Sequence, residues 1–134
     1  MTCNEIYAAA LKLIGEVDDA ERTEDYESRA PYIIAGFISD MRKLDNAYRK
    51  ANGIDSTDVG DTVYIELEKE FPLSDRFCMA AEFYLASMLL IDENSELSDT
   101  LYDRFCSAVT TITSEIPAVI EKIKDKYFFG DSII

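Results

Sequence analysis

Residues 71–92 (FPLSDRFCMAAEFYLASMLLID) most constrain the fold, because they hold the most apolar helical pattern in the chain. Apolar side chains recur there at the i, i+3, i+4, i+7 spacing of a helix with one wide buried face: Phe77, Ala80, Ala81, Tyr84, Leu85, Met88 and Leu89. Cys78, Ala86 and Ile91 widen that face. The sequence therefore predicts a central helix over 75–92, capped by Ser74 and covered by other elements on most sides.

Four other segments show the same spacing. A capping box, Thr2–Glu5, opens the first helix. A long second helix is predicted over about 23–50, and because its apolar period continues across Pro31, we expect a kink there rather than a break. Two more helices are predicted over 96–113 and 115–126. A chain of 134 residues suits one domain. The predicted fold is all-α: a single domain, 1–134, forming a small bundle of four to five helices.

The long loop over 51–73 is the least helical part of the chain. Within it, Val63, Ile65 and Leu67 alternate with polar or aromatic residues, which predicts one short β-strand segment. An isolated strand leaves its backbone groups open along both edges. We therefore expect 62–68, with Val63, Tyr64, Ile65 and Leu67, to be mobile in the monomer and to contact a neighbouring subunit or another protein. Pairing within the chain, with the C-terminal segment, is the competing interpretation.

The C-terminal tail, residues 127–134, holds five large apolar residues within eight positions: Tyr127, Phe128, Phe129, Ile133 and Ile134. Monomeric proteins rarely leave such a patch exposed. We expect these side chains to dock, either on their own bundle or on a neighbour.

The charge balance is strongly acidic, with 27 Asp and Glu against 13 Lys and Arg and a net charge of −14. Both halves of the chain share it. Direct binding of nucleic acid needs clustered Lys and Arg, so this charge balance argues against such binding. The balance is compatible with a surface that DNA passes without binding. The local basic cluster over 42–50 is interleaved with Asp40 and Asp45, which favours a solvated helix face.

The sequence predicts no membrane span, because it has no apolar run of about 18 residues, and its first residues are too polar and acidic for a signal peptide. Three cysteines without a CxxC spacing indicate free thiols in a reducing compartment. Cys78 and Cys106 lie in apolar helical stretches, where we expect them to act as small hydrophobic side chains.

No residue pattern points to catalysis, a cofactor or a metal. The chain has no His, which removes the commonest general base and the commonest zinc ligand. Residues 55–66 resemble a calcium loop at Asp55, Gly60 and Glu66, but Thr57 and Val59 stand at two ligand positions, which favours a solvated acidic loop. We predict no catalytic, cofactor-binding or metal-binding residues and no enzyme activity. A carboxylate-based hydrolase stays an alternative.

Three stretches resemble the small head–tail connector (adaptor) proteins of tailed bacteriophages and prophages. Residues 24–33 (EDYESRAPYI) look like the start of the long helix of that family. Residues 70–77 (EFPLSDRF), with the alanines and tyrosine that follow, look like its next helix, and 97–105 looks like the helix after that. The resemblance spans about residues 1–127 and consists of packing and capping patterns.

The resemblance implies a small α-helical bundle with a long loop. Copies of such proteins form a homo-oligomeric ring below the portal protein, continue the DNA channel and accept the tail or a stopper protein. It also implies a protein of the bacterial cytoplasm that later enters the virion, through which DNA passes without specific binding. The alternative is a small acidic cytosolic helical adaptor or regulator that binds one protein partner.

Overall fold

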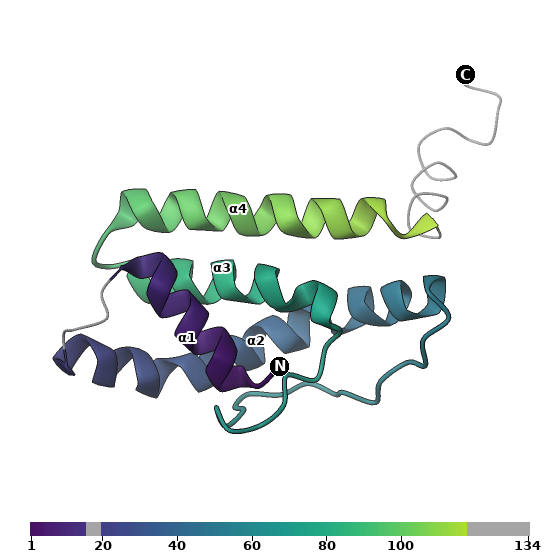
Figure 1. Cartoon of the computed structure of the whole chain (residues 1–134), viewed down its shortest axis with the longest axis horizontal. Helices are drawn as coiled ribbons and strands as arrows, with labels where there is room; N and C mark the ends of the chain where they lie inside the picture. Colours follow the sequence, from purple (N-terminus) through teal and green to yellow (C-terminus); the bar gives the residue numbers. More distant parts are fainter. Residues whose placement is uncertain (16–19, 118–134) are drawn as a thin grey trace, which may run out of the picture.

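The computed structural model describes residues 1–15 and 20–117. Within these residues the chain forms four α-helices and no β-strand, so the predicted all-α fold is confirmed (Figure 1). A short 3-10 turn precedes the third helix. The elements in chain order are α1 (Cys3–Ile14), α2 (Ala20–Ala51), the 3-10 turn (Asp75–Phe77), α3 (Cys78–Leu90) and α4 (Ser95–Ser114).

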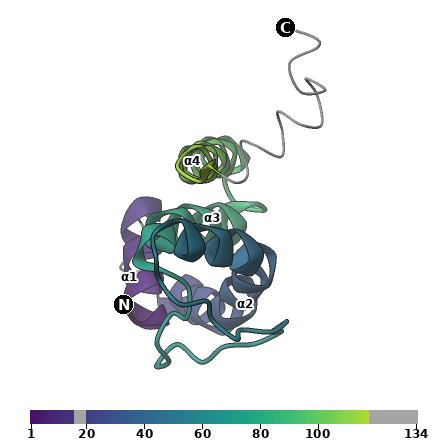
Figure 2. The ribbon, with the colours of Figure 1, turned by 90° about the vertical axis from the view of Figure 1, so that its right-hand side faces the viewer.

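The helix α3 is the centre of the bundle, as the sequence predicted. It contacts α1, α2 and α4. Figures 1 and 2 show α4 lying along one side of α3, while α1 and α2 lie on the other side. Leu85, in the middle of α3, has no exposed surface, and Leu89 has 1%. Burial on several sides explains why α3 is apolar around most of its circumference.

The predictions for the start of α1 and for the continuity of α2 are confirmed. The Thr2 hydroxyl accepts the Glu5 amide while the Glu5 carboxylate accepts the Thr2 amide, which completes the capping box. Gly15 ends α1 in the left-handed conformation at φ 80°. The long second helix runs from Ala20 to Ala51 with Pro31 inside it, so Pro31 does not break the helix, as predicted; the kink expected there stays a prediction.

The start of the central helix differs from the prediction. Residues 75–77 form the 3-10 turn, and α-helical geometry begins only at Cys78. Ser74 precedes the turn, but its hydroxyl makes no cap; the Oγ atom is buried and has no hydrogen-bond partner in the described structure. The Ser74 amide instead donates to the Asp45 carboxylate at 2.9 Å, so a contact from α2 sets this entry.

The prediction for Cys106 was wrong, because its side chain is exposed on α4. Cys78 is buried as expected, and so is Cys3. Burial raises the pKa of each of these two thiols to about 11, because the charged thiolate is poorly solvated there. All three cysteines are free.

The prediction of a short strand in the long loop was also wrong. Residues 62–68 form no ladder, and Thr2 and Glu70 make a single isolated antiparallel bridge nearby. The reason is that the backbone groups of this segment bond to scattered points on other elements. The Ile65 amide donates to the Pro31 carbonyl at 3.2 Å, and the Thr62 amide donates to the Ser39 hydroxyl at 2.9 Å.

Helix α1 uses further groups of the same segment. The first amides of any helix lack partners inside the helix. Here the Cys3 amide donates to the Lys69 carbonyl at 2.9 Å, and the Asn4 amide donates to the Leu67 carbonyl at 2.8 Å. The loop therefore caps α1 from outside, and its pairing within the chain is with the N-terminal segment.

The C-terminal predictions lie largely outside the described residues. Of the helix predicted over 115–126, only 115–117 are described, and Ile116 is fully buried. The tail over 127–134, with Tyr127, Phe128, Phe129, Ile133 and Ile134, lies wholly outside them.

Candidate functional site

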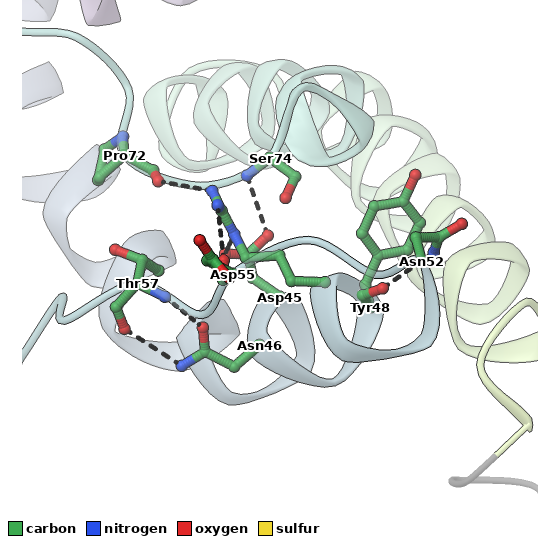
Figure 3. Close-up of polar contacts among 9 residues, drawn as sticks. Asp45, Asn46, Tyr48, Asn52, Asp55, Thr57, Pro72 and Ser74 are labelled. Atoms are coloured by element: carbon green, nitrogen blue, oxygen red, sulfur yellow. Dashed lines mark hydrogen bonds and ion pairs between the residues drawn. The ribbon is translucent and has the colours of Figure 1, made fainter.

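The long loop is fastened to the C-terminal half of α2 by a buried charge pair (Figure 3). The Asp45 side chain has no exposed surface, and its carboxylate accepts a hydrogen bond from Arg49 Nε at 2.8 Å. Its other oxygen accepts the Ser74 amide at 2.9 Å. An ionised carboxylate is costly to bury unless it is paired in this way, so the two contacts depend on one another.

The same turn of α2 also binds the early part of the loop. Arg49 donates to the carbonyls of Asp55 and Pro72, each at 3.3 Å. Asn46 exchanges two hydrogen bonds with the backbone of Thr57, at 3.0 and 3.4 Å. Figure 3 shows these contacts converging from both ends of the loop on a single stretch of helix. We call this set, Asp45, Asn46 and Arg49, the loop clamp.

The middle of the loop is held along the middle of α2, between Tyr32 and Ser39. The Ser39 hydroxyl both accepts from the Thr62 amide and donates to the Thr62 carbonyl, each at 2.9 Å. Two tyrosine rings, Tyr32 and Tyr64, meet edge to face with centroids 5.0 Å apart. A loop with this many anchors presents its exposed side chains in fixed positions.

The four loop residues predicted to interact divide into two kinds. Val63 is 79% exposed and Tyr64 is 50% exposed, whereas Leu67 is buried in the core and Ile65 is partly buried against it. Tyr32 on α2, which packs against Tyr64, is 57% exposed. Tyr32, Val63 and Tyr64 together form an exposed apolar surface, which we call the tyrosine surface.

A shallow groove between α2 and α3 adjoins the tyrosine surface and shares Tyr32 with it. It is lined by Ser28, Arg29, Tyr32, Ile33, Met88 and Ile91. Ile91 is 52% exposed. Arg29 spans the groove wall, because its guanidinium contacts the Asp25 carboxylate at 3.2 Å and donates to the Met88 carbonyl at 3.1 Å. We call this feature the α2–α3 groove. None of its six lining residues is acidic.

Two side-chain contacts of ionisable groups join distant elements of the described chain. Arg76 holds the Glu115 carboxylate with two hydrogen bonds, at 2.9 and 3.0 Å, and so lowers the pKa of Glu115. The Tyr26 hydroxyl on α2 donates to the Glu93 carboxylate in the turn before α4. Desolvation raises the pKa of the Glu82 carboxyl on α3.

The described residues contain no candidate metal site and no candidate membrane span. No group of three or more His, Cys, Asp or Glu among residues 1–15 and 20–117 is arranged to hold a metal ion. Over the same part of the chain, none of the helices combines the length and apolar character that crossing a bilayer requires.

Sequence reasoning missed the loop clamp. It read the charges over 42–50 as a solvated helix face, but Asp45 is fully buried and the Arg49 side chain is only 18% exposed. The i, i+4 spacing of the pair was visible, because such residues share a helix face. The burial of the pair could not be predicted from the sequence, because it depends on where the long loop packs.

Comparisons of this chain with models of protein families, with curated proteins and with solved structures gave no match.

Proposed function

We propose that this protein is a structural head–tail connector of a tailed bacteriophage or prophage. Its copies would form a ring below the portal protein, continue the DNA channel and accept the tail or a stopper protein. It would occur in the host cytoplasm before assembly and in the virion afterwards. The proposal rests on the sequence resemblance and on the physical features below.

The resembling stretches form three helices of the bundle. Residues 24–33 lie in α2, 70–77 lead into α3, and 97–105 lie in α4. These helices contact one another through α3. The resemblance is therefore supported by a helical fold with one long loop, which is the architecture that it implies.

The tyrosine surface is the observation that carries the proposal. Val63 and Tyr64 are large, apolar and exposed, yet they belong to a loop anchored by Ser39, Pro31 and the loop clamp. Rigid aromatic side chains are typical centres of protein–protein interfaces, because binding costs them little conformational entropy. A loop held in this way suits contact with an adjacent subunit or portal protein.

The acidic charge supports the proposed passage of DNA. With a net charge of −14, a ring of copies would repel phosphate along its channel, and packaged DNA would find few groups that hold it. This role requires no enzyme chemistry, cofactor or metal.

The proposal can be tested by gel filtration with the portal protein encoded nearest to this chain's gene. We expect the two proteins to elute together, and a Val63→Glu, Tyr64→Glu double variant to elute separately, because two charges would enter a desolvated contact. Met79→Glu is the matched control, since Met79 is 60% exposed on α3.

Separate elution of the wild-type protein from portal would contradict the connector role. In that case, capture of one host protein with the same sensitivity to Val63→Glu, Tyr64→Glu would support the acidic adaptor instead.

A further inference from the structure

The α2–α3 groove is an apolar surface that the described chain leaves uncovered. Its side chains come from two helices, and Tyr32 and Ile91 on its rim are each more than half exposed. It lies beside the C-terminal end of α3, which is also where α4 begins (Figure 1). Apolar surfaces of this kind mark contact sites when a suitable occupant exists.

The chain holds such an occupant beyond Pro117. Residues 127–134 carry Tyr127, Phe128 and Phe129 in a row, followed by two isoleucines. Their electrostatics also suit the groove. Residues 1–117 contain 24 of the 27 acidic residues and 10 of the 13 basic ones, whereas 118–134 contain three of each. The terminal segment is thus the neutral part of a strongly acidic protein, and the groove has no acidic lining residue.

The length of the connecting chain decides which copy supplies the segment. Helix α4 has 20 residues, or about 30 Å, and it ends at the opposite end of the bundle from the groove (Figure 1). Phe129 follows Pro117 by twelve positions. If the sequence-predicted helix continues to residue 126, this stretch spans only about 25 Å. With that predicted helix the segment would fall short of its own groove, whereas a neighbouring copy has no such limit.

We infer that the α2–α3 groove binds the aromatic segment Tyr127–Phe129 of a second copy of this chain. The aromatic rings would lie against Tyr32, Met88 and Ile91. Because the donor's own groove stays open for a third copy, the contact is head-to-tail. Such contacts close into rings when the rotation permits and otherwise form open filaments.

This inference deepens the proposed function, because it names the contact between ring subunits, but its test needs no portal protein. Two chains, each with one added cysteine, are made in a Cys106→Ser background, because Cys106 is the exposed native thiol whereas Cys3 and Cys78 are buried. One carries Ile91→Cys and the other Phe129→Cys. The chains are mixed at equal concentration under mild oxidation, and disulfide-linked heterodimers are measured by mass spectrometry.

We expect the Ile91→Cys and Phe129→Cys chains to cross-link, and a Met79→Cys and Phe129→Cys mixture to cross-link at least about tenfold less. Equal yields in the two mixtures would overturn the inference. A third chain carries both Ile91→Cys and Phe129→Cys. A disulfide that forms only within this chain, at a yield independent of concentration, would also overturn the inference, because that result places the segment in its own groove.

A second experiment measures self-association in chains that keep all three native cysteines. In analytical ultracentrifugation, Ile91→Glu and Phe128→Ser should each raise the concentration at half association by about tenfold or more, as for loss of an interface anchor. Met79→Glu should leave it unchanged. A wild-type chain that stays monomeric at every concentration contradicts the inference. Portal binding without self-association would support the connector role and contradict the groove contact. Self-association without portal binding would support the groove contact and contradict the connector role.

Discussion

Asp45 and Arg49 lie one turn apart on α2 and form a charge pair whose carboxylate is completely shielded from water. The Nε–carboxylate distance is 2.8 Å, and the same carboxylate accepts the Ser74 amide. The pair therefore joins α2 to the residue before the 3-10 turn. Because the start of α3 follows directly, the position of the central helix depends on this contact.

Arg49→Met should destabilise the fold by about 3 kcal/mol, the cost of leaving a buried carboxylate without its cation. The result is measured as the free energy of unfolding in urea. Arg42→Met is the matched control, because Arg42 pairs with Asp61, whose side chain is 81% exposed, and exposed pairs contribute about 0–1 kcal/mol. Equal decreases in the free energy of unfolding for Arg49→Met and Arg42→Met would show that burial of Asp45 does not determine the strength of its pairing.

Leu85→Ala should cost roughly 2–5 kcal/mol, the usual range for truncating a buried leucine. Leu85 has no exposed surface in the middle of α3. Met79→Ala, on an exposed part of the same helix, should change the free energy of unfolding by less than about 0.5 kcal/mol. A loss below about 1 kcal/mol for Leu85→Ala would remove this side chain from the core.

Ile65→Pro should loosen the loop without unfolding the bundle. Proline has no amide hydrogen, so the variant loses the 3.2 Å hydrogen bond to the Pro31 carbonyl. In amide hydrogen exchange, we expect faster exchange at Thr62 and unchanged exchange in the middle of α3. Ile65→Ala keeps the amide and serves as the control. Faster exchange throughout α3 would mean that the loop contributes to global stability.

Thiol labelling should separate the three cysteines. At pH 8 a maleimide should modify Cys106 within minutes and leave Cys3 and Cys78 unmodified, because these two are buried and hold pKa values of about 11. Peptide mass spectrometry identifies the labelled residue. In denaturant all three should react, and labelling of Cys78 in the native protein would contradict its burial.

Stability should fall as pH rises from about 9 to 11. The folded pKa values of Cys3 and Cys78 exceed the ordinary value of 9.0, so in this window the unfolded chain binds fewer protons than the folded chain. Each thiol contributes a loss of unfolding free energy of up to about 3 kcal/mol at the upper end of this pH range. Cys3→Ala, Cys78→Ala should flatten the slope of unfolding free energy against pH, and Cys106→Ala should leave it unchanged.

The helices were predictable because their signals are local. The Thr2–Glu5 capping box and the apolar spacing around Leu85 each lie within one or two turns of chain. The loop was not predictable in the same way. Val63, Ile65 and Leu67 alternate like a strand, but the backbone of this segment bonds to Pro31, Ser39 and the start of α1, which lie far away in sequence. The exposed groove between α2 and α3 also depends on packing between distant segments, so no sequence pattern revealed it.

The capping of α1 by the loop has a consequence for how the chain is made. Asn4 and its acceptor Leu67 are 63 positions apart, so a ribosome finishes α1 long before it produces the carbonyls that complete the first turn. Synthesis adds about 5–20 residues per second, which leaves this helix end open for several seconds. During that interval α1 has its local Thr2–Glu5 capping box, but it lacks both the loop carbonyls and the central helix that covers its apolar face. Helix α1 is thus synthesised well before the loop carbonyls that bind its first amides. The full set of native contacts of α1 can form only after more than half of the 134 residues have been translated.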